Sequence, residues 1–150
     1  MTEVYRAPMR SRRDELDPQG ALERALRRGL VGFGEAGVEG AAALERLARR
    51  VQRFAAVPDG SFVWTRDGDG RYRLGRVDGP YRYDNDPAAV AVDLLHVRPC
   101  TWCPIPVAEA EVPAAVVATF GRGGRNFQRT HDPDVGAQTA RLWAALAESA

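Results

Sequence analysis

The chain has 150 residues, of which 45% are apolar and 27% charged, the balance of one ordinary globular domain. All 21 basic residues are arginine, and the absence of lysine excludes a P-loop nucleotide site and a Schiff-base lysine. The formal net charge is +1, so a site for a polyanion has to be a local patch.

Two helices are predicted in the first part of the chain. The first begins at Asp17-Pro18 and ends at Gly29, because leucines follow its start at four-residue spacing. The second covers Val38 to Phe54 and is ended by Pro58. Its arginines fall mostly off its apolar stripe, so they are expected on the solvent side.

The middle of the chain changes to a two-residue period, which is typical of strands. Residues 61–66 and 71–77 alternate on either side of Asp67-Gly68-Asp69-Gly70, and this pattern predicts a β-hairpin. Further strands are expected over 81–83, 92–97 and 126–130.

Residues 113–120 predict a short helix closed by Gly121, and a glycine-rich loop follows as far as Arg125. Asp132-Pro133 begins a C-terminal helix over about 133–147, whose apolar face includes Val135 and Leu142. The order of helices, a strand-rich middle and a last helix predicts an α+β fold, formed by a single domain over 1–150.

The two cysteines invite a metal interpretation. Cys100 and Cys103, with His96 and His131, give four candidate zinc ligands. A lone C-x-x-C is a weak signal and is better explained by one or two small core residues, and Pro104 argues against a redox helix at this point. We expect neither a metal nor a cofactor.

The chain carries no segment typical of secretion or membrane insertion. Its first residues lack the pattern of a signal peptide, and no stretch approaches the roughly 20 apolar residues of a membrane span. Two cysteines do not make a disulfide scaffold, so the expected location is the cytoplasm.

Aromatic residues concentrate in the strand-rich middle. Six of the twelve fall between positions 62 and 102: Phe62, Trp64, Tyr72, Tyr81, Tyr83 and Trp102. A barrel lined in this way could hold a flat ring between aromatic faces, although each aromatic also fits an ordinary β core. The loop from Gly121 to Arg125 could cradle a phosphate, or could simply connect a helix to a strand.

Three segments together resemble a known family. They are Leu30-Val31-Gly32-Phe33-Gly34, the run from Gly75 to Tyr83 and the run from His96 to Trp102. Their patterns are similar to the G-[WF]-G turn, the G-x-V-x-G-x-Y-x-Y strands and the H-x-R-x-V-x-W strand of PUA-like barrels of the EVE type. That family includes the reader domains attached to modification-dependent restriction endonucleases. The likeness covers roughly residues 20–130, with Phe33 where many relatives have tryptophan and Cys100 where an aliphatic residue is usual.

The resemblance implies a PUA-like (EVE-like) mixed β-barrel of about five to six strands flanked by helices. It implies a reader of a modified base in restriction or defence, with a modified cytosine in DNA flipped into an aromatic pocket. The expected partner is nucleic acid, with DNA favoured over RNA, and a separately encoded nuclease is a further candidate. Neither catalysis nor membrane association is implied.

The resemblance also implies site residues. The pocket candidates are Phe33, Gly34, Glu35, Trp64, Tyr81, Tyr83 and Trp102, with Glu35 as an acceptor for a cytosine amino group. The phosphate-binding candidates are Arg82, Arg98, Arg122, Gly123, Gly124 and Arg125.

Two alternatives remain open from the sequence. One is an enzyme that uses the same pocket on a nucleotide or small molecule, with His96 or Asp84 as general base. The other is a protein-interaction module without a pocket. Turnover assays and soaks with free modified bases distinguish these alternatives from the reader.

Overall fold

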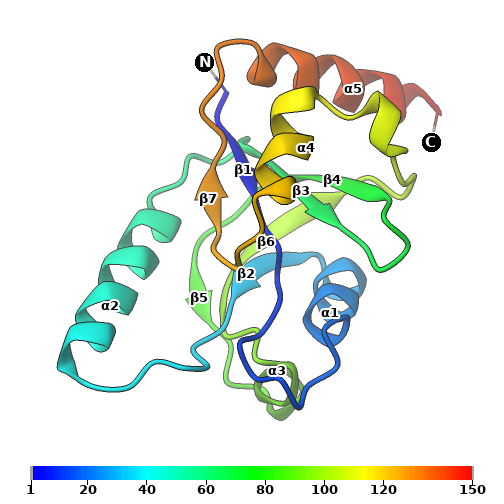
Figure 1. Ribbon diagram of the computed structural model, residues 1–150. Helices are drawn as coiled ribbons and strands as arrows, with labels where there is room; N and C mark the ends of the chain where they lie inside the picture. Colours follow the sequence, from blue (N-terminus) through cyan, green and yellow to red (C-terminus); the bar gives the residue numbers. More distant parts are fainter. Residues whose placement is uncertain (1, 150) are drawn as a thin grey trace.

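A curled mixed β-sheet forms the centre of the protein (Figure 1). The computed structural model describes residues 2–149. The strands are β2 (Leu30–Phe33), β6 (His96–Trp102), β4 (Tyr72–Val77), β3 (Phe62–Arg66), β1 (Val4–Arg6) and β7 (Gln128–Arg129), in spatial order, with β5 (Arg82–Tyr83) also paired to β6. The β1–β3 pair is parallel and the other pairs are antiparallel.

Helices flank the sheet at both ends and along one side (Figure 1). They are α1 (Gly20–Arg28), α2 (Ala41–Ala55), α3 (Pro87–Val92), the short 3₁₀ helix η1 (Glu109–Glu111), α4 (Ala114–Gly121) and α5 (Val135–Ser149). In Figure 1, α4 and α5 lie together at one end, α1 and α3 at the other, and α2 stands at the side. The expected α+β class, with a curled sheet between helices, is confirmed.

The alternation of side chains along the strands divides the interior into two apolar cores. On β3, Phe62 and Trp64 enter the core beneath α4 and α5, whereas Val63 enters the core that α1 and Phe54 complete. Trp143 of α5 packs on Phe62, with ring centroids 5.6 Å apart. The face of β3 that carries Trp64 is therefore filled by helices.

The local signals in the sequence correspond well to the elements. The β3–β4 hairpin pairs Arg66 with Tyr72, and the Asp67 carboxylate accepts the N–H groups of Asp69 and Arg71 inside the turn. The left-handed Gly29, at φ 68°, ends α1 as expected.

Several boundaries differ from the sequence predictions. α1 begins at Gly20, two residues after Pro18, because Asp17 caps a separate turn by accepting the N–H of Gln19. α2 begins at Ala41, since Gly40 has a φ of 86° that is not helical. Residues 30–33, which resemble the segment of the G-[WF]-G turn, form strand β2. Within β2, Gly32 packs so closely on His96 of β6 that an added Cβ would lie 1.9 Å from the His96 carbonyl oxygen.

Three elements were not predicted: β1, α3 and the 3₁₀ helix η1. β1 pairs in parallel with β3, and α3 begins where the Asp86 carboxylate accepts the N–H of Ala88. Over residues 2–149, no helix is both long and apolar enough to cross a bilayer.

Candidate functional site

The candidate site is a cavity of about 460 Å³ between α2, β7 and the chain segments that follow β1 and β2. Its wall contains the end of α3 as well, so five parts of the sequence converge on it. The lining residues are Tyr5, Arg10, Ser11, Arg12, Phe33, Gly34, Ala36, Val38, Arg50, Arg53, Phe54, Val57, Asp93, Arg125, Asn126, Phe127, Gln128, Arg129 and His131.

Four aromatic side chains form one connected surface in this cavity. Tyr5 and Phe127 stack with centroids 4.9 Å apart and planes 13° apart. Phe54 meets Phe127 edge-on at 5.0 Å and Phe33 at 5.1 Å. Phe54 is only 2% exposed and anchors the surface, while the other three rings are half-buried and accessible from the cavity. Such a surface suits a flat aromatic ligand.

Six arginines surround the aromatic surface: Arg10, Arg12, Arg50, Arg53, Arg125 and Arg129. Asp93 is the only acidic residue in the described wall of the cavity. The Arg50 guanidinium lies 5.8 Å above the Phe33 ring. Burial lowers the pKa of Arg50, and the neighbouring charges of Arg12, Arg53 and Arg46 lower it further. The cavity is thus a local concentration of positive charge in a nearly neutral protein.

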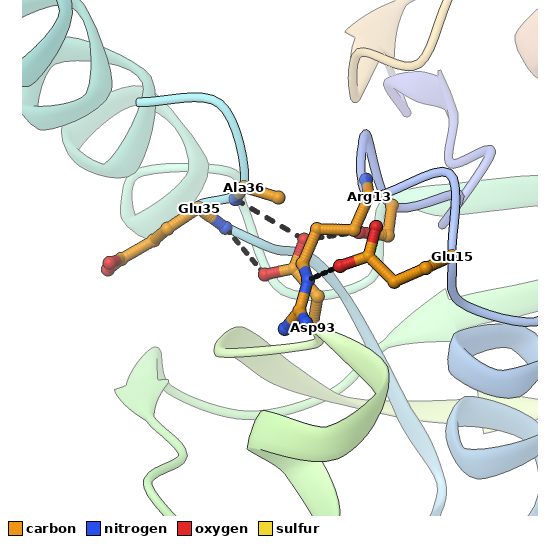
Figure 2. A network of polar contacts seen from close by, with 6 residues as sticks. Arg13, Glu15, Glu35, Ala36 and Asp93 are labelled. Carbon is orange, nitrogen blue, oxygen red and sulfur yellow. Dashed lines mark hydrogen bonds and ion pairs between the residues drawn. The ribbon is translucent and has the colours of Figure 1, made fainter. Parts of the chain in front are cut away.

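Asp93 connects three parts of the cavity wall (Figure 2). Its carboxylate accepts the Ser11 hydroxyl at 2.6 Å, the Glu35 N–H at 2.9 Å and the Ala36 N–H at 3.3 Å. The Ser11 hydroxyl oxygen in turn accepts the N–H of Arg13. Asp93 is 7% exposed, and these donors satisfy the hydrogen-bonding capacity of its buried carboxylate.

Backbone strain is concentrated beside the same cavity. Among the described residues, Met9 at φ 51° and Asp93 at φ 55° are the only non-glycine residues with a positive φ. Met9 immediately precedes Arg10, and the Ser11–Asp93 hydrogen bond connects the two strained segments. Each such conformation costs about 1–3 kcal/mol and persists only where surrounding contacts hold it, commonly at functional sites.

A hydrogen-bonded chain of three side chains supports Phe33 from behind. The Tyr81 hydroxyl lies 2.8 Å from His96 Nδ1, and His96 Nε2 lies 2.7 Å from the Glu35 carboxylate. A neutral His96 with its proton on Nε2 satisfies both contacts. Burial raises the pKa of Tyr81, and the charges of Glu35 and Tyr83 add to the effect. The His96 ring, 5.4 Å from that of Phe33, therefore has both nitrogens engaged.

The structure places the predicted pocket residues in three different surroundings. Phe33 and Gly34 line the cavity, and Glu35 and Tyr81 belong to the chain behind it. Tyr83 is 49% exposed on β5, 5.3 Å from His96.

Trp64 and Trp102 lie away from the cavity. Trp64 is fully buried, and its indole N–H donates to the Thr139 hydroxyl of α5 at 3.3 Å. Trp102 donates its indole N–H to the Leu30 carbonyl at 2.9 Å. Both tryptophans are oriented by protein partners, so the ring surface of the cavity comes from other residues.

The predicted phosphate-binding residues are dispersed as well. Arg125 lines the cavity, whereas Arg82 is exposed on β5, 3.7 Å from the Asp84 carboxylate. Gly123 and Gly124 bend around the buried Arg6, whose guanidinium donates to the carbonyls of Thr119, Gly123 and Asn126. Arg122 is exposed on this loop and does not line the cavity.

Arg98 has a structural role in place of the predicted phosphate contact. It is 3% exposed and donates to the carbonyls of Phe54, Val57 and Gly79 at 2.7–2.9 Å, and to the Asp59 carboxylate at 2.7 Å. These acceptors include a carbonyl at the C-terminal end of α2, where a cation is favourable. All three of its guanidinium nitrogens donate inside the protein, and Arg98 does not line the cavity.

The two cysteines are both buried free thiols. Burial raises the pKa of Cys100 well above its ordinary value, with a further contribution from Asp78, and burial also raises that of Cys103. Within residues 2–149, no three His, Cys, Asp or Glu side chains are grouped as a metal site requires.

Comparison with known proteins gives a likeness in fold. No family model and no curated protein matches the sequence. The YTH domain of the Zygosaccharomyces rouxii MRB1 protein, solved in complex with N6-methyladenosine RNA, superposes with a TM-score of 0.50 at 12% identity, over 97% of this chain and 86% of that one. The Agrobacterium tumefaciens protein Atu2648 gives a TM-score of 0.41 at 12% identity, over 94% of this chain and 92% of that one. This chain therefore shares the fold of a YTH domain.

Proposed function

We propose that this protein is a nucleic-acid-binding module that reads one modified base, and that the base occupies the cavity between α2 and β7. The observation that carries the proposal is the combination of a connected aromatic surface with a rim of six arginines in one cavity of about 460 Å³. Aromatic rings bind bases and guanidinium groups bind phosphates, so the cavity offers partners for both parts of a nucleotide.

The energetics of base reading fit this arrangement. Taking a base out of its stack costs a few kcal/mol, and stacking on an aromatic side chain returns about 1–3 kcal/mol per base. Phe33, Tyr5 and Phe127 supply such faces. The cavity volume lies within the usual range of about 300–1,000 Å³ for small-ligand sites, which leaves room for a base with an added group.

Two modified bases are the first ligands to test. The sequence resemblance to EVE-type readers favours a modified cytosine in DNA, with a separately encoded nuclease as a further partner. The similarity in fold to a domain solved with N6-methyladenosine RNA favours a methylated adenine. The aromatic and cationic residues of the cavity suit both a modified cytosine in DNA and a methylated adenine in RNA. Oligonucleotides carrying each base therefore belong in one binding panel.

We propose binding without catalysis. The two candidate general bases are buried and paired: His96 has both ring nitrogens engaged, and Asp84 forms an ion pair with Arg24 at 3.1 Å. Incubation with the preferred strand should therefore return it unchanged.

The test is a titration with pairs of oligonucleotides that differ by one modified base. One pair in the panel should show a preference of about tenfold or more, equivalent to about 1.4 kcal/mol. Phe33→Leu should reduce that preference by removing an aromatic face. Phe120→Leu, at a ring of the opposite core, is the matched control and should keep it. Equal affinity for all pairs by the folded protein would overturn the proposal.

A further inference from the structure

Helix α2 carries four arginines within eight residues: Arg46, Arg49, Arg50 and Arg53. Its single acidic residue is Glu45. Arg46, Arg50 and Arg53 follow at spacings of four and three, so they share one face of the helix. Arg50 and Arg53 line the cavity, which places this face toward the site.

These arginines lack the acidic partners that normally accompany such a concentration of charge. None of the four forms an ion pair with any described residue. The Nε of Arg50 is buried, and no hydrogen-bond acceptor reaches it from anywhere in residues 2–149. A buried donor without an acceptor is unfavourable, and mutual repulsion between like charges adds to the cost. A bound anion would relieve both.

The protein fixes α2 at the end nearest the cavity. The buried side chains of α2 are Leu47 and Phe54, and Phe54 belongs to the aromatic surface. Arg98 holds the chain at the end of the helix by donating to the Phe54, Ala55 and Val57 carbonyls. The first turns are largely exposed, including Leu44 at 57%. The arginines thus lie on a helix whose C-terminal end is held by contacts and whose outer face is exposed.

We propose that α2 binds the phosphodiester backbone on one side of the base held in the cavity, so that the ligand is a single strand with at least one flanking phosphate, not a free base or nucleoside. The proposal rests on the proposed function, because the strand is oriented by the base in the cavity. Planar guanidinium groups bind phosphate through paired hydrogen bonds, which matches the type of cation that lines α2. Arg125 and Arg129 lie on another wall of the same cavity, and the strand would leave toward them.

The test compares double variants by the salt dependence of binding to short single strands of RNA and of DNA. Each phosphate contact on a single strand contributes a log–log slope of about −0.7, so loss of two contacts should reduce the slope by about 1.4. Arg50→Gln with Arg53→Gln should show this reduction on plain and modified strands alike. Arg46→Gln with Arg49→Gln removes two exposed arginines and should also reduce the slope without a folding defect.

The matched control is Arg27→Gln with Arg28→Gln, which removes the same charge from exposed positions on α1 outside the cavity. Its slope should equal that of the unmodified protein. Equal slopes for the α2 and α1 variants would overturn the proposal, as would competition by polyglutamate as effective as that by the strand. If the protein showed no preference between modified and plain strands but the α2 variants still showed reduced salt slopes, only the reader function would be overturned.

Discussion

Replacement of Asp93 by alanine tests whether one carboxylate holds the cavity wall together. The change removes three hydrogen bonds, from Ser11, Glu35 and Ala36, and leaves their donors near a site that is 7% exposed. Hydrogen bonds to a charged acceptor contribute about 1.5–3 kcal/mol each, and some of the freed donors regain water. At φ 55° alanine lacks the polar side chain whose local hydrogen bonds let aspartate adopt the left-handed conformation, which adds about 1–2 kcal/mol. We expect a total loss of about 4–6 kcal/mol.

Asp93→Asn distinguishes the effect of the negative charge of Asp93 from the effects of its backbone conformation and side-chain size. Asparagine tolerates the left-handed conformation and keeps one acceptor oxygen, so it should cost about 1–2 kcal/mol. Urea unfolding followed by circular dichroism measures both values through the midpoint and slope. Asp86→Ala, which removes the cap of α3, serves as control and should cost about 1 kcal/mol. If Asp93→Ala were no more destabilising than the Asp86 control, Asp93 would not be the connection that the structure indicates.

Three further predictions follow from buried groups. Arg98→Lys should cost about 2–4 kcal/mol in urea unfolding, because a lysine ammonium cannot reach carbonyls and a carboxylate on several sides at once; a change below 0.5 kcal/mol would contradict this. Burial, together with the hydrogen bond and charge of Glu3, raises the pKa of Tyr5 to about 12 against an opposing effect of Arg129. Folding therefore keeps this phenol protonated, and its contribution to stability is full below pH 10 and is lost as pH rises toward 12. Tyr5→Phe should remove an ionisation near pH 12 from the absorbance titration at 295 nm. Replacement of Cys100 and Cys103 by serine should cost on the order of a few kcal/mol, whereas stoichiometric zinc in fresh protein, lost together with folding on chelation, would show a metal site.

The elements that the sequence predicted best are those fixed by neighbours in the chain. The β3–β4 hairpin is specified by alternation on both sides of a four-residue turn, and Gly29 ends α1 through its own conformation. β1 escaped prediction because its three residues depend on a parallel partner nearly sixty positions away. Its short sequence carries no period of its own.

The candidate site was harder to predict, because burial is decided by distant segments. The two-residue period shows that Phe62 and Trp64 share a face, but not that α5 covers it. Arginine commonly binds phosphate, so the sequence made Arg98 a candidate ligand. Only the fold shows that carbonyl groups at the end of α2 accept its N–H groups. The sequence already showed that the arginines of α2 lie outside its apolar stripe. Their excess over acidic residues in this helix could have indicated that α2 forms the cationic wall of the cavity.

Amide chemical-shift mapping shows where on the protein nucleic acid binds, which we propose is the cavity between α2 and β7. During titration with the preferred single strand, the largest shifts should fall on Gly34, Ala36 and Phe127, which line the cavity. The indole N–H signals of Trp64 and Trp143, in the core beneath α4 and α5, should move little. If the largest shifts surrounded those two tryptophans and the cavity amides stayed in place, nucleic acid would bind elsewhere on the protein.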